Sequence, residues 1–179
     1  MTIGGTTRTG SSTERALRVA LAAASREGAR TELFDGPFLA SLPVYNPENP
    51  SRTEAEQRLV ESVRAADALI IACPGYHGGL AGMVKNAIDL LEDTAKDTRV
   101  YFDGMPVGLI VAAHGWQATG STLGAMRSIV HAMRGWPTPL GVAINSGEAI
   151  FDEAGNCSEP RVTDQLNALA CQLLWFLRR

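Results

Sequence analysis

The sequence predicts an α/β protein built on a parallel sheet with helices on both faces. Apolar stretches typical of strands alternate along the chain with stretches of helical periodicity. Two of the apolar stretches, residues 68–73 and 106–113, contain no alternating polar residues. Such runs are typical of parallel strands that are buried on both faces. With 179 residues, the chain is expected to form one domain, 1–179, of five strands and five helices.

The first strand is expected to be very short, covering only residues 2–4 or 2–5. Either the start codon lies upstream or this strand is stunted. A helix over residues 12–27 should follow, because four apolar side chains recur at helical spacing on one face: Leu17, Ala20, Leu21 and Ala24. Gly28 is a suitable stop for that helix. Residues 31–34 then form the second strand.

A long surface loop is predicted over residues 38–50, because it contains Pro43, Pro47 and Pro50. Ser51 and Glu54 match the capping-box pattern that begins many helices. The next helix should therefore reach about residue 66.

The second half of the chain continues the alternation of strands and helices. It is expected to contain, in order, the strand 68–73, the helix 82–91, a polar connection 92–104, the strand 106–113, the helix 121–134, the strand 140–145, a turn at 151–155 and the helix 162–177.

Three glycine-rich loops follow the first, third and fourth strands: residues 4–13, 74–79 and 114–120. We refer to them as loops one, two and three. Ligands of open α/β sheets bind outside the carboxyl ends of the strands. Because all three loops belong to that edge, the sequence predicts that they surround one site.

Loop one is suited to a phosphate group. Glycines let backbone N–H groups converge, and a helix N-terminus adds unpaired donors with a partial positive charge. Hydroxyl groups and the guanidinium of Arg8 add further donors. The alternative is an ordinary strand-to-helix turn that is capped by Ser11 and Glu14.

Loops two and three each combine glycines with one large aromatic residue, Tyr76 and Trp116. Glycine allows the backbone to approach a flat ligand closely. A mononucleotide with a planar ring fits this pattern, with its phosphate at loop one and its ring between loops two and three. His77 and His114 are expected to pack or to form hydrogen bonds rather than to act in catalysis.

The overall composition excludes several other classes of function. The net charge is −3 and the basic residues are scattered, whereas a nucleic-acid surface needs clustered Lys and Arg. No apolar stretch is long enough to span a bilayer. Cys73, Cys157 and Cys171 lack metal-ligand spacing and any C-x-x-C motif, which indicates reduced thiols in a cytoplasmic protein without a metal.

Three motifs resemble those of the NADPH-dependent FMN reductases, and the resemblance covers nearly the whole chain. Residues 5–11 resemble the family's phosphate loop, G-S-x-R-x-x-S. Residues 74–89 resemble its flavin-ring motif, P-x-Y-x-G-S followed by L-K-N-A-x-D, and residues 42–47 resemble its second-strand loop. The resemblance implies a flavodoxin-like three-layer sandwich, with a five-stranded parallel sheet in the order 2-1-3-4-5.

Carried over by position, the resemblance also implies the residues that hold FMN. The phosphate would be bound by Thr6, Arg8, Ser11 and Thr13. The isoalloxazine would be wrapped by Pro74, Gly75, Tyr76, His77 and Gly78, with Gly115 closing its other edge. The chain departs from the pattern at Thr6 and Gly79, where Ser is usual, and at Gly75, where Glu is common.

The activity implied by the resemblance is hydride transfer from NADPH or NADH to N5 of FMN, and from there to a second flavin, a quinone or another small oxidant. The flavin would carry the chemistry, so no catalytic side chain is expected. One alternative is a flavodoxin-like electron carrier, although carriers are usually strongly acidic. Another is a mononucleotide-binding module without enzymatic activity.

Nothing else in this single domain is expected to cover the hydride-accepting face of the flavin, and enzymes enclose such a centre to exclude side reactions. We therefore expect a homodimer or a dimer of dimers whose flavin sites are completed at the subunit interface. The segment around Tyr45 and residues 92–104 are expected to cover the site of the neighbouring subunit. Four side chains on one helix form an apolar face that either packs in the core alone or, as the resemblance implies, also extends into a contact between subunits: Met83, Val84, Ile88 and Leu91.

Overall fold

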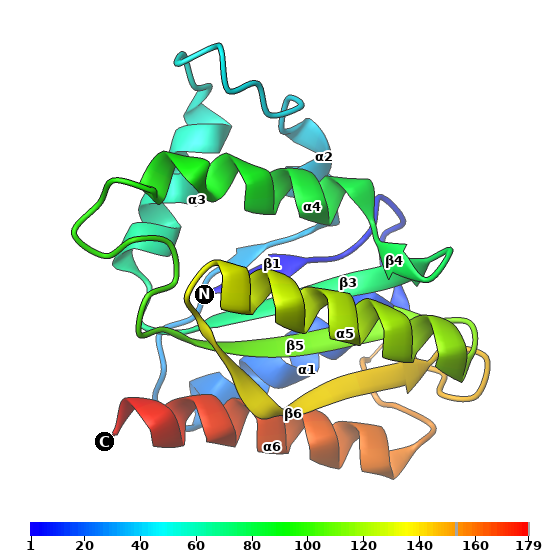
Figure 1. The fold of residues 1–179 in the computed structure, drawn as a ribbon. Helices are drawn as coiled ribbons and strands as arrows, with labels where there is room; N and C mark the ends of the chain where they lie inside the picture. The colour runs from blue at the N-terminus through cyan, green and yellow to red at the C-terminus, as the bar shows by residue number, and fades with distance from the viewer. Residues whose placement is uncertain (153, 179) are drawn as a thin grey trace.

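The computed structural model describes residues 1–152 and 154–178 and confirms the α/β fold, with a parallel sheet between two layers of helices (Figure 1). The parallel strands lie in the order β2-β1-β3-β5-β6. Their bounds are β1 Thr2–Gly4, β2 Leu33–Phe34, β3 Leu69–Tyr76, β5 Pro106–Ala113 and β6 Trp136–Asn145. The predicted order, 2-1-3-4-5 in a sheet of five, omitted the short strand β4 (Gly79–Leu80), which pairs antiparallel with β3.

Two hydrophobic cores lie on opposite faces of the sheet, because successive side chains of a strand point to opposite sides. In β3, Ile71 and Cys73 belong to the core under the helices α3 (Glu54–Ala65), α4 (Gly82–Asp89) and α5 (Trp116–Ala132). Ile70 and Ala72 belong to the core under α1 (Ser12–Arg26) and α6 (Pro160–Leu177). Both faces of β3 are therefore covered, as its unbroken apolar sequence predicts.

The apolar face of α4 packs mainly inside its own chain and not against a second subunit. Val84, Ile88 and Leu91 are buried in the core of their own chain, so for these three the alternative of core alone is confirmed and the contact between subunits is wrong. Met83 is only partly buried. A 3-10 helix, η1 (Leu90–Thr94), continues from α4 into the stretch predicted as a polar connection.

The predicted loop 38–50 is partly helical, because α2 spans Gly36–Ser41. Asp35 caps this helix by accepting the N–H of Phe38, and Pro37 occupies a first-turn position that needs no N–H donor. The next helix, α3, begins two residues later than a Ser51–Glu54 box would require. Its capping box consists of Thr53 and Glu56, whose side chains each accept the other's backbone N–H.

Three elements of the second half begin earlier than predicted, and α6 does so by only two residues. Helix α5 starts at Trp116, directly after Gly115, and contains most of the predicted loop three. Strand β6 starts at Trp136 although Pro137 and Pro139 follow, which is tolerated because β6 lies at the edge of the sheet. No described helix is long and apolar enough to cross a membrane.

Candidate functional site

The three glycine-rich loops lie together at the carboxyl ends of the parallel strands, which we call the carboxyl edge of the sheet (Figure 1). The register pairs Gly4 of β1 with Ala72 of β3, Pro74 of β3 with Ala112 of β5, and Ala113 of β5 with Asn145 of β6. Loop one therefore leaves the sheet beside β3, and loop two leaves it beside the start of loop three.

Loop one is closed by its own side chains. The Thr6 hydroxyl accepts the N–H of Arg8 and donates to the carbonyl of the same residue, both at 3.1 Å. Ser11 caps α1 by accepting the N–H of Glu14 at 3.2 Å, while the Glu14 carboxylate accepts the N–H of Gly10 at 3.0 Å. This is half of the predicted capping box, because Glu14 reaches back to Gly10 rather than to Ser11.

The beginning of α1 keeps backbone donors available. Among the hydrogen bonds of the described residues, none uses the N–H of Ser12 or Thr13. Helix N-termini with free N–H groups attract anions. Arg8 is exposed, and within the described part of the chain it forms no ion pair. The loop can therefore offer two amides, the Ser11 hydroxyl and one guanidinium to a phosphate.

Loop two is a β-hairpin and not the open loop that its sequence suggested. Strands β3 and β4 are joined by His77 and Gly78, whose φ angles of 52° and 78° are those of a type I′ turn. Helix α5 braces this hairpin, since Ser121 donates to the Gly78 carbonyl at 3.0 Å and Thr122 to the Gly79 carbonyl at 3.4 Å. The bracing fixes the position of the turn before any ligand binds.

Gly75, the position where the family commonly has Glu, packs tightly against α5 and β5. A Cβ here would lie 2.9 Å from the Thr122 hydroxyl and 3.0 Å from the Ala113 methyl group. Pro74 is buried, whereas 58% of the Tyr76 side chain is exposed. The hairpin thus presents Tyr76 and His77 outward and keeps Pro74 and Gly75 as its packed base.

Loop three is held by Asn145, a residue that the sequence analysis missed. The Oδ1 atom of Asn145 accepts the N–H of Gly115 at 2.9 Å and of Gly147 at 3.1 Å, and its Nδ2 donates to Glu148 at 2.6 Å. The Gly115 amide is therefore already paired. Its φ of 110° favours glycine, and a Cβ there would meet no atom within 4 Å, so this side of the loop is open.

The residues at this edge fit FMN. Free amides and a guanidinium at loop one suit the phosphate, and the backbone is open at Gly79 and Gly115, where a Cβ would meet no atom within 4 Å. Tyr76 and Trp116, each 58% exposed, offer two aromatic surfaces beside these positions. The described residues contain no group of three or more His, Cys, Asp and Glu side chains that could hold a metal ion.

A large groove is also present far from the three loops, so the size of a cavity does not by itself identify the candidate site. A groove of about 680 Å³ lies at the opposite edge of the sheet, beside Met1 and the end of α6. Its lining includes the charged residues Arg30 and Glu32 together with apolar residues such as Leu173 and Leu177. The donors and the open glycine positions lie instead at the carboxyl ends of the strands, where ligands of parallel sheets bind.

Cys73 lies at the base of the hairpin and belongs to the core, as expected from its apolar surroundings. Its thiol accepts the N–H of Ala81 at 3.3 Å and donates to the carbonyl of Pro74 at 3.3 Å. Burial raises the pKa of the Cys73 thiol to about 11. Since the thiolate is the reactive form, this residue is no nucleophile near neutral pH.

The raised pKa of Cys73 predicts a loss of stability in alkali. The unfolded chain loses this proton near pH 9 and the folded chain near pH 11, so the stabilisation is complete below pH 9 and disappears as the pH rises to 11. We expect Cys73 to contribute on the order of 2 kcal/mol to this decline. Urea unfolding at pH 8 and pH 11 measures it. Cys171→Ala, which removes an exposed thiol, should retain the decline, and Cys73→Ala should reduce it; equal declines in both variants would contradict the assignment.

Known proteins match both the sequence and the fold. The family model described as NADPH-dependent FMN reductase matches residues 1–149. An NADPH azoreductase of Bacillus sp. (strain OY1-2) is 28% identical over 139 residues, which cover 77% of this chain and 74% of that protein. An FMN-dependent NADPH-azoreductase of Staphylococcus aureus is 33% identical over 132 residues, which cover 70% of this chain and 65% of that protein.

Solved structures with low sequence identity share the fold. A flavoenzyme NAD(P)H:(acceptor) oxidoreductase from Paracoccus denitrificans has a TM-score of 0.76 at 18% identity, covering 99% of this chain and 97% of that one. A flavodoxin from Megasphaera elsdenii has a TM-score of 0.60 at 18% identity, covering 96% and 99%. Both confirm the flavodoxin-like arrangement of strands and helices.

Proposed function

Because the chain belongs to the NADPH-dependent FMN reductase family, we propose that it uses bound FMN to pass hydride from NADPH or NADH to a small oxidant. A second flavin and a quinone are two such oxidants, and the names of the bacterial relatives add azo compounds. The observation that carries the proposal is the juxtaposition of free α1 amides with a braced hairpin and an open Gly115 at one sheet edge.

Each of the predicted residues has a defined task in this proposal. The phosphate is held by the amides of Ser12 and Thr13, the hydroxyls of Ser11 and Thr13, and Arg8. Thr6 shapes loop one from within, because its hydroxyl is engaged with Arg8. The ring lies against residues 74–78 and beside Gly115. Bound FMN supplies the hydride acceptor, so the protein contributes position and electrostatics.

An absorbance spectrum of the purified protein tests this function. After FMN is added and unbound FMN is removed, we expect the protein to retain a flavin spectrum, whose visible absorbance is lost when NADPH is added without oxygen. The spectrum should return when a quinone or an azo dye is supplied. A protein that binds FMN but is not bleached by NADPH or NADH would instead be an electron carrier, and a protein that binds no FMN would be neither.

The two histidines at the site are expected to be dispensable for the chemical step. We expect His77→Ala and His114→Ala each to leave kcat within about tenfold of the wild type, because a general acid or base usually contributes ~10²–10⁴-fold. Steady-state NADPH oxidation with saturating FMN measures this. A hundredfold lower kcat with FMN still bound would show that one of them takes part in proton transfer.

The homodimer remains part of the proposal, with a narrower interface than the sequence suggested. Val44 is 86% exposed in the segment around Tyr45, and Tyr101 is half-buried in the stretch 92–104, so both can contact a second subunit. Phe102 is fully buried and cannot. Sedimentation at micromolar concentration should give a dimer or a tetramer. A fully active monomer would exclude a site completed between subunits.

A further inference from the structure

Asn86 lies in residues 84–89 of α4, V-K-N-A-I-D, and both ends of its side chain bond to a segment more than forty positions earlier. Its Nδ2 donates to the Pro43 carbonyl at 2.8 Å, and its Oδ1 accepts the N–H of Tyr45 at 2.8 Å. These two bonds fix the backbone of Pro43 and Tyr45, the residues on either side of Val44. The Val44 side chain lies between two anchored residues and is nevertheless 86% exposed.

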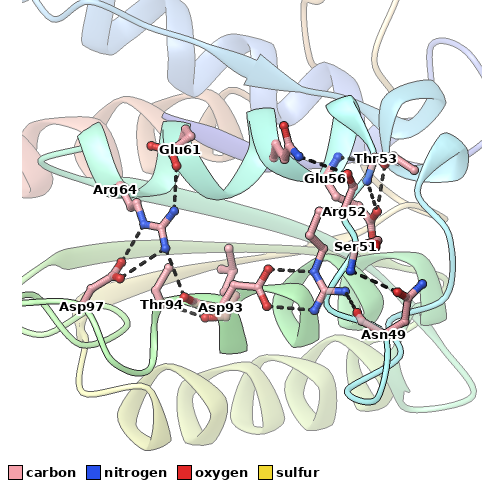
Figure 2. Close-up of polar contacts among 12 residues, drawn as sticks. Asn49, Ser51, Arg52, Thr53, Glu56, Glu61, Arg64, Asp93, Thr94 and Asp97 are labelled. Carbon is pink, nitrogen blue, oxygen red and sulfur yellow. Dashed lines mark hydrogen bonds and ion pairs between the residues drawn. The ribbon is translucent and has the colours of Figure 1, made fainter.

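The same segment has a second anchor at its other end, shown in Figure 2. Arg52 forms a two-pronged ion pair with Asp93 of η1, at 2.7 and 2.9 Å, and also donates to the Asn49 carbonyl. The Arg52 guanidinium lies 5.2 Å from the centre of the Tyr45 ring. Only 11% of the Arg52 side chain is exposed, so this pair is better shielded than an ordinary surface ion pair.

The anchored segment is connected to the proposed site from two directions. Its N-terminal end continues from α2, whose first residue, Gly36, packs so closely on loop one that a Cβ would lie 1.8 Å from the Thr6 carbonyl. We call the two hydrogen bonds of Asn86 to residues 43 and 45 the clamp. Helix α4 begins at Gly82, directly after the hairpin, and Asn86 follows four residues later. The clamp therefore lies about one helical turn (roughly 6 Å) along α4 from the hairpin. Residues 43–45 are therefore linked to loop one through α2 and to the hairpin through α4.

We infer that Asn86 is a positioning residue of the reductase, which presents Val44 and Tyr45 as a preformed surface for the planar ring of an incoming substrate. This inference rests on the proposed function. An exposed valine beside a tyrosine offers an apolar contact to a flat ring, and a segment ordered in advance binds without the entropic cost of ordering a loop. Among the described residues, both side-chain hydrogen bonds of Asn86 go to residues 43 and 45 and none goes to loop one or the hairpin, so we expect the effect on substrate binding.

Three variants of the full-length protein test the inference. For Asn86→Ala we expect the amide of Tyr45 to exchange hydrogen about tenfold faster, since its hydrogen-bond acceptor is gone. We also expect KM for NADPH to rise about fivefold, with kcat and the Kd of FMN within about twofold. Asn86→Asp retains the acceptor for Tyr45 but not the donor to Pro43, so it should keep Tyr45 protected and give an intermediate KM. Lys85→Ala, which removes an exposed pair with Asp89 on the same helix, is the matched control and should match the wild type.

The outcomes separate the inference from the proposed function. Unchanged exchange at Tyr45 in Asn86→Ala would show that the clamp does not hold the segment. Faster exchange with an unchanged KM, or equal losses of FMN affinity and kcat, would reduce Asn86 to a structural role. A wild-type protein that binds FMN without oxidising NADPH would instead overturn the proposed function itself, and the substrate role of Asn86 with it.

Discussion

Replacing Gly4 with alanine is expected to destabilise the protein by about 3–4 kcal/mol and to impair FMN binding. Gly4 ends β1 with a φ of 153°, a conformation that side chains rarely adopt. A Cβ in this position would lie 2.1 Å from the carbonyl oxygen of Ala72, its partner on β3. The obstacle is backbone in the middle of the sheet, so β1 would have to leave its register, and loop one would move with it.

Thermal unfolding and FMN titration of Gly4→Ala measure this effect, with a melting temperature lower by roughly 6–16 °C. Gly124→Ala is the matched control. Gly124 is exposed within α5, and a Cβ there would meet no atom within 4 Å. Because alanine favours a helix by up to about 1 kcal/mol over glycine, this variant should be as stable as the wild type or more so. A Gly4→Ala protein that melts like the control would show that β1 can relax without cost.

The layered fold was predictable because its main signals are local in the sequence. The continuous apolar runs of β3 and β5 identify strands covered on both faces, and helical periodicity identifies α1 and α6. The same local signals did not show what the apolar face of α4 packs against. Val84, Ile88 and Leu91 look alike whether they pack on their own sheet or on another subunit, and only the assembled fold distinguishes the two.

The details of the site depend on contacts between distant residues, and these leave little trace in the sequence. The turn at His77 and Gly78 was missed as a hairpin because its bracing comes from Ser121 and Thr122, more than forty positions later. Asn145 is one polar residue at the end of an apolar strand, and its role follows only from the register of β6 beside β5. The motif residue Asn86 was recognised, but its two contacts to residues 43 and 45 could not be inferred from spacing.

Helix α2 is a different kind of omission, since its signals are present in the sequence. Asp35 and Pro37 are a suitable cap and first-turn residue, and Leu39 supplies the buried side chain. The helix was missed because Pro43, Pro47 and Pro50, which follow it, led to the prediction of one loop over residues 38–50. The proline-containing part, residues 42–53, is indeed irregular, although polar contacts hold it at both ends.

The phosphate site is tested most directly by Arg8→Ala, which is expected to weaken FMN binding roughly 10–100-fold. Arg8 is exposed on loop one, and the described residues provide no carboxylate partner for it, so its guanidinium is available to a ligand. A hydrogen bond to a charged group contributes about 1.5–3 kcal/mol, which corresponds to that loss of affinity. Fluorescence titration with FMN measures the effect.

Riboflavin and a second arginine variant decide whether the lost affinity belongs to the phosphate. Riboflavin lacks the phosphate group, so its Kd should be the same for Arg8→Ala and the wild type. Arg30→Ala removes an equal charge from the groove at the opposite edge of the sheet and should leave FMN binding unchanged. Because an exposed pair is screened by salt, the gap between Arg8→Ala and wild type should narrow as ionic strength rises. Equal FMN affinity of Arg8→Ala and Arg30→Ala would place the phosphate away from Arg8 and leave the amides and hydroxyls of residues 11–13 to hold it.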